Sequence, residues 1–502
     1  MNASTTRPTG CRLVVVGGGF SGACLAIQLV RGSALPLAIT IIDPAERIGR
    51  GLAYSAVDPD HRLNAPTFSH SLLPEDAWHL SRWCLEQGLA QQDPQAMRPD
   101  GAAYIRRSDY GRYLEQTLSD HAHWPANGST IRHCRDTAVG FGLPGEPLVV
   151  QTSAGHRLPA DQVFVATGNP LPRLQAPFPT ALAGHPRIIE NPLDTARLAG
   201  IDPQARVLLV GAGLTSLDVL STLLRRNHRG GLEVVSRHGL RPRTQAPVAP
   251  VLARAQSSQA IAAMPAAIAL DRVHGPPAAW LSAASATPDV RRWLRALRLR
   301  IREVQAGGGV WYQAFDDLRD SVWQLWPTLP VAQKRRFIGR LRTWYDVHRF
   351  RAPPQNEDMV ETARAQGRVH FLAARLRAVT VSSGGEGIEV TMRRRGDVAD
   401  VTGTYDVVIN CTGLDPVAGL AGNPFLASLL QGGWIRRDPC GLGFEVDATG
   451  RAVGSDGMAR ARLRLVGPPT VGSFGDPIGA VFISLQIHRM LAEVFSEMAG
   501  RR

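Results

Sequence analysis

The sequence predicts an α/β protein in which one local pattern occurs twice: an apolar strand, a glycine-spaced turn and then a helix. The first copy is RLVVVGGGFSG at residues 12–22, and the second is RVLLVGAGLTSLD at residues 206–218. Two further apolar strands, within 162–168 and 405–413, both end in Thr-Gly. A strand that runs into such a turn and then into a helix is typical of dinucleotide-binding folds. We therefore expect two Rossmann-like domains.

The composition is that of a large globular protein. A chain of 502 residues exceeds what one hydrophobic core supports, and a content of 44% hydrophobic and 20% charged residues is not that of a disordered chain. The formal net charge is +13, but Lys334 is the only lysine and the arginines are spread along the chain. Because dispersed charges usually cover solvated faces, we expect no nucleic-acid partner.

The six cysteines indicate neither a metal site nor a redox-active dithiol. They form no CxxC pair and have no metal-ligand spacing. The chain also has no run of 18 or more apolar residues, so we expect no membrane segment and a cytoplasmic location. The sequence does not determine the oligomeric state.

The first glycine turn predicts the binding site of one dinucleotide. Gly17 permits the tight turn, Gly19 lets the backbone approach a pyrophosphate, and Gly22 lets the helix pack on the strand. The unpaired N–H groups at the helix N-terminus face the phosphates. The cofactor contacts expected in this helix start are Phe20 and Ser21.

The next strand and the loop beyond it complete this predicted site. The strand at 37–42 ends in Asp43, about 20 residues past Gly22, where a carboxylate accepts ribose hydroxyls. The following loop contains GRGLAY and LNAP, and in a dinucleotide fold it runs along the cofactor past Leu52. Asn64 is a candidate hydrogen-bond partner for the flavin edge; the alternative is a turn asparagine before Pro66.

In flavoproteins with two nucleotide domains, a strand ending in Thr-Gly closes the sheet of the first domain beside the cofactor. Both such strands, together with the last strand near 463–466, predict further FAD contacts. These contacts are Thr167, Gly168, Thr412, Gly413 and Gly467. We interpret the strand at 405–413 as the return of the chain to the first domain. The helix at 480–498 then directs its N-terminus at the flavin, where its dipole stabilises a reduced, anionic ring.

The second glycine turn predicts an NADPH site. Its cofactor-binding residues are Gly211, Gly213, Thr215 and Ser216, with the serine small enough for close helix packing. The next strand ends in Ser236-Arg237, where an NAD site carries an acid. A hydroxyl and a cation favour the 2′-phosphate of NADPH, with Arg241 or Arg243 as a helper; the alternative is a surface arginine.

The dinucleotide pattern is interrupted between 246 and 354, where Pro- and Ala-rich linkers lead into helices predicted at 289–304, 314–327 and 331–345. The predicted organisation is an FAD domain (10–195 and 405–495), an NADPH domain (196–245 and 355–404) and a helical insertion (246–354) that forms a substrate lid. Its candidate pocket residues are Trp344, Tyr345, His348 and Arg349; the alternative is an aromatic core.

Together these motifs resemble a group of bacterial FAD/NAD(P)-binding proteins with an N-terminal GxGxxG, a GRGLAY…LN(A/V)P loop and an internal GxGLTxxD. The group is related to the flavin-dependent N-hydroxylating monooxygenases, and the resemblance spans almost the whole chain. Two features depart from related enzymes. The FxGxxxHxxx(W/F) signature of class B monooxygenases is missing, and the last FAD strand ends in Val466-Gly467-Pro468 instead of Gly-Asp, the expected ribityl-binding acid.

The leading hypothesis is an NADPH-dependent FAD monooxygenase that N-hydroxylates a small amine or amino acid with molecular oxygen, through a C4a-hydroperoxyflavin. The residues expected at its active site are Asn64, Arg106, Arg107 and Arg349, the arginines as candidates to hold a substrate carboxylate. The alternative enzyme is an NAD(P)H-dependent flavin oxidoreductase that inserts no oxygen. A third hypothesis, a non-catalytic redox-responsive binding protein, is disfavoured because the chain keeps two nucleotide motifs.

Overall fold

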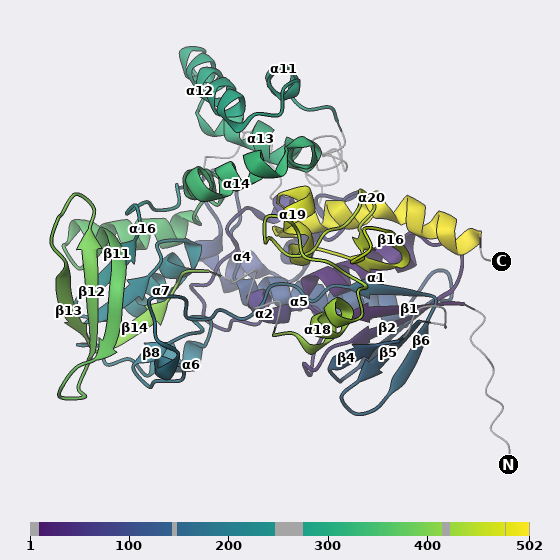
Figure 1. Ribbon diagram of the computed structural model, residues 1–502, viewed down its shortest axis with the longest axis horizontal. Helices are drawn as coiled ribbons and strands as arrows, with labels where there is room; N and C mark the ends of the chain where they lie inside the picture. The colour runs from purple at the N-terminus through teal and green to yellow at the C-terminus, as the bar shows by residue number, and fades with distance from the viewer. Residues whose placement is uncertain (1–9, 143–147, 246–274, 414–421, 477, 501–502) are drawn as a thin grey trace.

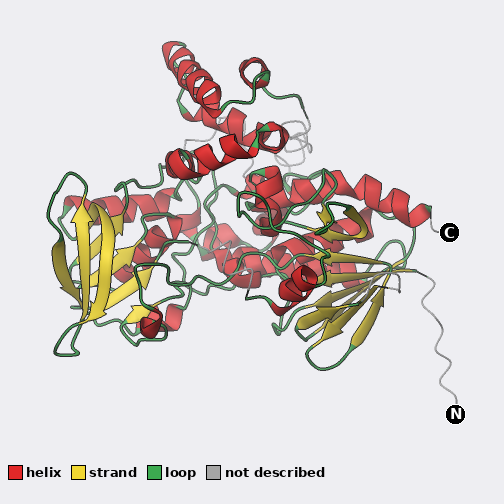
Figure 2. Cartoon of the chain, in the orientation of Figure 1, coloured by secondary structure: helices red, strands yellow, loops and turns green. Residues whose placement is uncertain are grey.

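A computed structural model describes residues 10–142, 148–245, 275–413, 422–476 and 478–500 (Figure 1). Two sheets lie at opposite ends of the long axis, and a group of helices stands above the region between them (Figures 1 and 2). The Pro- and Ala-rich linker predicted from residue 246 falls mostly within 246–274 and so lies outside the described residues. No helix in the described ranges is long and apolar enough to span a bilayer.

The first sheet has six strands in the order β15-β16-β7-β1-β2-β3. Their bounds are β1 Cys11–Val16, β2 Leu37–Ile42, β3 Thr130–Cys134, β7 Gln162–Val165, β15 Arg451–Val453 and β16 Ala459–Leu465. All neighbours pair in parallel except β15, which is antiparallel to β16. Because β1 is covered on both faces, its central residues are all apolar, which explains the run of valines.

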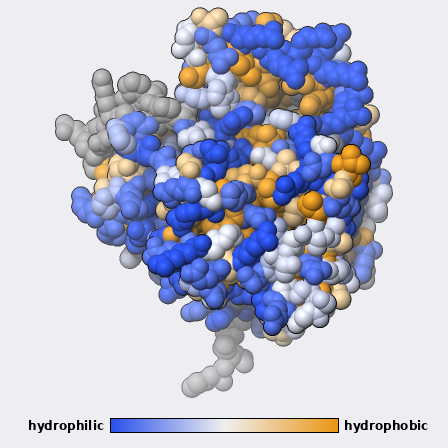
Figure 3. Space-filling model, turned by 90° about the vertical axis from the view of Figure 1, so that its left-hand side faces the viewer, coloured by the Kyte–Doolittle hydropathy of each residue, from blue (hydrophilic) through white to orange (hydrophobic). Residues whose placement is uncertain are grey.

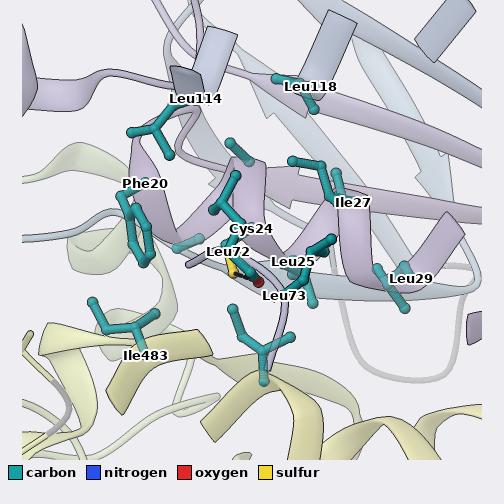
Figure 4. Close-up of a cluster of buried hydrophobic side chains, with 14 of the residues drawn as sticks. Phe20, Cys24, Leu25, Ile27, Leu29, Leu72, Leu73, Leu114, Leu118 and Ile483 are labelled. Carbon is teal, nitrogen blue, oxygen red and sulfur yellow. Dashed lines mark hydrogen bonds between the residues drawn. The ribbon is translucent and has the colours of Figure 1, made fainter. Parts of the chain in front are cut away.

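Helix α1 (Phe20–Gly32) is the centre of the first core. Its side chains are buried almost throughout, and it packs between α5 (Arg107–His123) and α20 (Ala480–Ala499). Figure 4 shows Leu114 and Leu118 of α5 on one side of this helix and Ile483 of α20 on the other. This packing holds the start of α20 close to the start of α1, although the two helices are far apart in the sequence.

Smaller elements surround this sheet. A three-stranded antiparallel sheet contains β4 Ala138–Phe141, β5 Leu148–Thr152 and β6 Arg157–Ala160. The helices beside the first sheet are α2 Gly51–Tyr54, α3 His79–Glu86, α4 Leu89–Gln92, α18 Pro424–Gln431 and α19 Val471–Phe474. Helices α3 and α4 are separate because Gly88, between them, adopts φ +62°, which interrupts a helix.

The second sheet has seven strands in the order β13-β12-β11-β10-β9-β14-β8. Their bounds are β8 Ile188–Ile189, β9 Val207–Val210, β10 Leu232–Ser236, β11 Val369–Val381, β12 Ile388–Arg394, β13 Val401–Tyr405 and β14 Val407–Asn410. The helices with it are α6 Thr195–Ala199, α7 Leu214–Arg225 and α16 Pro354–Ala365.

One predicted domain boundary is wrong. The strand expected to return the chain to the first domain at 405 is β14, and β14 pairs in parallel with β9 inside the second sheet. The strand β8, from the segment assigned to the first domain, pairs on the other edge of β14. The strands β7 and β14 hold the same place, beside the strand that runs into the glycine turn of their sheets, and both run into Thr-Gly, so the pattern alone did not show which domain the later strand belongs to.

The inserted helices are α11 Ala279–Ser285, α12 Val290–Ala306, α13 Tyr312–Leu325, α14 Val331–Arg340 and α15 Arg342–Arg349. They stand above the region between the two sheets (Figure 1). Side-on, hydrophobic surface is visible between these helices at the top and the body below (Figure 3). The predicted helices are confirmed, but the last one is divided into α14 and α15.

Candidate active site

The first glycine turn is shaped by close backbone contacts. Gly17 has φ +106°, and a Cβ there would collide with the carbonyl of Ala166 at the end of β7. A Cβ at Gly22 would collide with the carbonyl of Gly17 itself. A Cβ at Gly19 would lie 3.3 Å from the Cα of Gly51, so this glycine accommodates the neighbouring loop at the predicted phosphate site.

The turn leaves polar groups without a protein partner, as a phosphate or ribose site requires. No side chain caps α1, whose N-cap is Gly19. The hydroxyl of Thr167 is buried without a hydrogen-bond partner. Beside it, Gly168 has φ +68° and open space where a Cβ would lie. These features fit a bound dinucleotide.

The predicted ribose acid, Asp43, lies beside this turn. Its carboxylate accepts the N–H of Gly18 at 2.6 Å and the N–H of Ala45 at 2.9 Å. The backbone carbonyl of Asp43 also contacts His133. Each carboxylate oxygen keeps a second lone pair, to which a ribose hydroxyl can donate. These hydrogen bonds are therefore compatible with the predicted role of Asp43.

The other residues predicted around the first turn are more deeply packed. Phe20 is buried against Tyr54 and Tyr110 in the first core. Ser21 is buried, and a Cβ on Gly467 would lie 2.6 Å from its hydroxyl oxygen. Leu52 lies half-buried in α2. The Phe20 ring therefore packs in the core beside the turn, and its contact with a cofactor stays a prediction.

The second glycine turn repeats the geometry of the first. Gly211 has φ +110°, and a Cβ there would collide with the carbonyl of Cys411 after β14, as Gly17 does with Ala166 after β7. Gly213 caps α7 without a side chain, and the space beyond its missing Cβ is open. The Ser216 hydroxyl donates to the Gly213 carbonyl at 2.7 Å and is fully buried, which confirms the close packing expected of this small residue. Thr215 is half-buried in the first turn of α7.

Positive charge gathers at the end of β10. Ser236 accepts the N–H of Gly239 at 3.0 Å, and the exposed Arg237 contacts only the Thr343 hydroxyl, at 3.5 Å, among the described side chains. His238 has its pKa lowered, mainly by burial and further by Arg237 and Arg395. The expected helper Arg241 pairs with Glu361 at 2.8 Å, and a phosphate would have to compete with this acid for it.

A cavity of about 840 Å³ lies where the two halves and the inserted helices meet. The first half contributes Asn64 and its neighbours, and the strand endings contribute Thr412 and Gly413. The N-terminal end of α20 and residues of α13 and α15 form the remaining wall. The inserted helices therefore line the cavity, as the lid hypothesis requires.

The structure separates the three predicted arginines. Arg106 pairs with the buried Asp93 at 3.2 Å and does not line the cavity, so its assignment to a substrate clamp is wrong. Arg107 lines the cavity but pairs with Asp218 of α7 at 2.6 Å. Only Arg349 lies on the wall that the inserted helices form.

The predicted aromatic pocket is also only partly present. Tyr345 and Arg349 line the cavity. Trp344 points away from the cavity to His238, at a ring-centroid distance of 5.8 Å, and His348 stacks on Phe315 at 4.8 Å. Residues one helical turn apart share a face, so 345 and 349 point one way while 344 and 348 point another.

Two acids on this wall were not predicted. Asp476 accepts a hydrogen bond from Arg349 Nε at 2.8 Å, and burial raises the pKa of Asp476 despite the arginine. Burial likewise raises the pKa of Asp346 to about 6, against the opposing effect of Arg342. The sequence signal for the first was Gly475-Asp476, a Gly-Asp pair that follows the last strand one short helix later than expected.

The two repeated glycine turns, each closed by the end of a parallel strand, define a protein with two dinucleotide-binding domains and a cavity between them. Residues 14–170 match the model of a family described as FAD-NAD(P)-binding. No curated protein matches the chain by sequence.

Solved structures share the fold over nearly the whole chain. The ornithine hydroxylase of Pseudomonas aeruginosa in reduced form is 15% identical, with a TM-score of 0.61 and coverage of 98% of this chain and 100% of that one. The L-lysine 6-monooxygenase of Pseudomonas syringae is 14% identical, with a TM-score of 0.63 and coverage of 97% and 99%. The ornithine N-hydroxylase of Kutzneria sp. 744, solved with reduced FAD, NADP⁺ and L-ornithine, has 14% identity, a TM-score of 0.61 and the same coverage.

These comparisons confirm the predicted fold class, two Rossmann-like domains of α/β type, and the predicted FAD/NAD(P)-binding domain at the first motif. At these sequence identities the likeness to the solved structures shows the fold alone. The roles assigned to single residues and the remaining domain boundaries stay predictions.

Proposed function

We propose that this protein is an FAD- and NADPH-dependent monooxygenase that hydroxylates the nitrogen of an amine or amino acid. The observation that carries the proposal is the cavity, which adjoins Asn64 and Gly413 on one side and the N-terminal residues of α7 and α20 on the other. Three solved structures with this fold are named as an ornithine hydroxylase, an ornithine N-hydroxylase and an L-lysine 6-monooxygenase. The proposal also agrees with the motif resemblance.

The residues present fit both cofactors. The turn at Gly17 and the unpartnered hydroxyl of Thr167 provide the FAD site, with Asp43 toward the ribose. The turn at Gly211 and the cation Arg237 provide the NADPH site. When bound, the cofactors supply hydride transfer and the activation of oxygen.

The chain itself contributes orientation and the exclusion of water. Asn64 lines the cavity, and its carbonyl accepts a hydrogen bond from Gln245, which fixes the loop. Burial lowers the pKa of His70 to about 4, so this cavity residue is neutral at pH 7. The inserted helices close one side, which keeps the reacting nitrogen away from bulk solvent.

The main alternative is a flavin oxidoreductase that transfers hydride without inserting oxygen. The two hypotheses share both cofactor sites and differ in the fate of oxygen. Oxygen consumption that matches the formation of a hydroxylated product separates them.

The first experiment is anaerobic reduction of the purified yellow protein with NADPH and with NADH, followed by mixing with oxygen in the presence of an amine. We expect faster bleaching by NADPH and a product that carries one atom from isotopically labelled dioxygen. Reduction without label in any product would support the oxidoreductase. Failure of both nicotinamides to bleach the flavin would refute the NADPH site.

A further inference from the structure

We infer that the substrate is a monoamine with an apolar body and no carboxylate. The arginine that would otherwise hold a substrate carboxylate, Arg349, already pairs with Asp476 of the protein. This inference rests on the proposed function, since it names the substrate of that cavity. It separates this chain from enzymes that take ornithine or lysine.

The cation in question, Arg349, already has a buried acid and two aromatic rings beside it. Its Nε donates to Asp476 Oδ2 at 2.8 Å, and the two side chains are only 11% and 4% exposed. Its guanidinium also lies over the rings of Phe350 at 4.7 Å and Phe482 at 4.9 Å. A substrate carboxylate on the same guanidinium would share that one cation with Asp476, which would leave one buried negative charge without a cation of its own.

The other described arginines of the cavity wall are paired in the same way. Arg107 pairs with Asp218 at 2.6 Å and Arg342 with Asp346 at 3.4 Å. The remaining pairs join Arg319 to Asp316 and Asp320, and Arg351 to Asp316. A buried carboxylate needs its own cation, and each cation along this part of the wall already has an acid.

The same pairing disfavours a second ammonium group. The acids that line the described wall, Asp316, Asp320, Asp346 and Asp476, each have an arginine partner. A diamine or a basic amino acid would bring one more positive charge than these pairs balance. The wall therefore suits a molecule with a single amine.

Two polar groups remain for that amine. Asp476 Oδ1 and the Tyr345 hydroxyl are both buried without a hydrogen-bond partner. The carboxylate oxygen and the tyrosine hydroxyl oxygen can each accept an N–H of the amine, which leaves the nitrogen lone pair free to react. Ten Phe, Tyr and Trp side chains line the same cavity, which provides the surface for an apolar or aromatic body.

The test is calorimetric binding of matched pairs to the oxidised protein without NADPH, so that no turnover is needed. The pairs are tryptamine with tryptophan and phenethylamine with phenylalanine, with cadaverine as a diamine. We expect each monoamine to bind at least about tenfold more tightly than its amino acid or cadaverine, because desolvating an unpaired charge costs more than 1.4 kcal/mol. Tighter binding of an amino acid, or no binding of either monoamine, would overturn the inference.

A charge variant makes the test specific to Asp476. Asp476→Asn releases Arg349, so tryptophan should gain affinity and tryptamine should lose it. The matched control, Asp456→Asn, removes an exposed acid that pairs with Arg460 at 2.9 Å away from the cavity, and the ratio of the two affinities should stay unchanged. If Asp476→Asn does not fold, Arg349→Met keeps the acid and should retain tryptamine binding.

The outcomes of the two proposals are distinguishable. A protein that binds monoamines selectively but yields no oxygenated product would refute the monooxygenase while leaving the ligand class intact. A protein that oxygenates amino acids would support the monooxygenase and refute the inference about Asp476.

Discussion

Replacing Asp218 by Asn should destabilise the protein and impair flavin reduction together, because this acid joins the two halves. Asp218 belongs to α7 of the second sheet, and Arg107 to α5 beside the first. The pair is 2.6 Å long, with side chains 4% and 18% exposed. Asn356 adds a weaker hydrogen bond to the same carboxylate, at 3.4 Å.

The expected magnitude follows from burial. Removing one partner of a buried ion pair leaves an uncompensated charge and costs about 3–5 kcal/mol. Arg107 retains some contact with solvent, so we expect the lower end of this range, about 3 kcal/mol. Burial already raises the pKa of Asp218 although Arg107 and His61 oppose it, so the pair is held at a desolvation cost. The double variant Arg107→Met with Asp218→Leu should therefore recover stability.

The assay compares this pair with one of equal length inside the second sheet. Arg206 and Glu233 also lie 2.6 Å apart, but the arginine is 47% exposed, so Glu233→Gln should cost at most about 1 kcal/mol in urea denaturation. The rate of flavin reduction at saturating NADPH should fall in Asp218→Asn and in the double variant, but not in Glu233→Gln. If Asp218→Asn loses no more stability than Glu233→Gln and is reduced at the normal rate, the pair does not hold the domains together.

Two further predictions concern single charges. Arg237→Ala should reduce the preference for NADPH over NADH by roughly tenfold to a hundredfold, because a charge-assisted hydrogen bond contributes about 1.5–3 kcal/mol. The ratio of the flavin-reduction efficiencies with NADPH and with NADH measures this preference. An unchanged ratio would make Arg237 an ordinary surface residue. The pKa of Asp346 is about 6 in the folded protein and about 3.9 in an unfolded chain, so its stabilising contribution is present below pH about 4 and is lost as the pH rises through 6. The melting temperature of Asp346→Asn relative to the unchanged protein should therefore rise between pH 5 and pH 7.5, and a constant difference would contradict the burial argument.

The glycine turns could be predicted from the sequence because their constraint is local. Only glycine fits at Gly17 and Gly211, because each has a positive φ and lies against a carbonyl just past the end of a neighbouring strand. The residue type therefore reports the geometry directly. The buried strands were recognisable for a similar reason, since a strand covered on both faces must be apolar throughout.

The partners of the arginines could not be predicted, because they come from distant parts of the chain. Arg349 meets Asp476, and Arg107 meets Asp218, only after the two halves and the insertion have come together. A residue's charge does not reveal whether another element neutralises it. The sequence therefore indicated that Arg107 and Arg349 lie near the cavity, but it did not show that each forms an ion pair with an acid of the protein.

The cavity wall formed by α13 and α15 is nearly self-sufficient in charge. Its pairs Arg319–Asp316, Arg319–Asp320, Arg351–Asp316 and Arg342–Asp346 all close within residues 316–351. Only Arg349 reaches outside, to Asp476. Exchanging this wall together with position 476 would keep each of these five ion pairs complete. Ligand choice can thus be altered through this wall without changing a residue of the two nucleotide sheets.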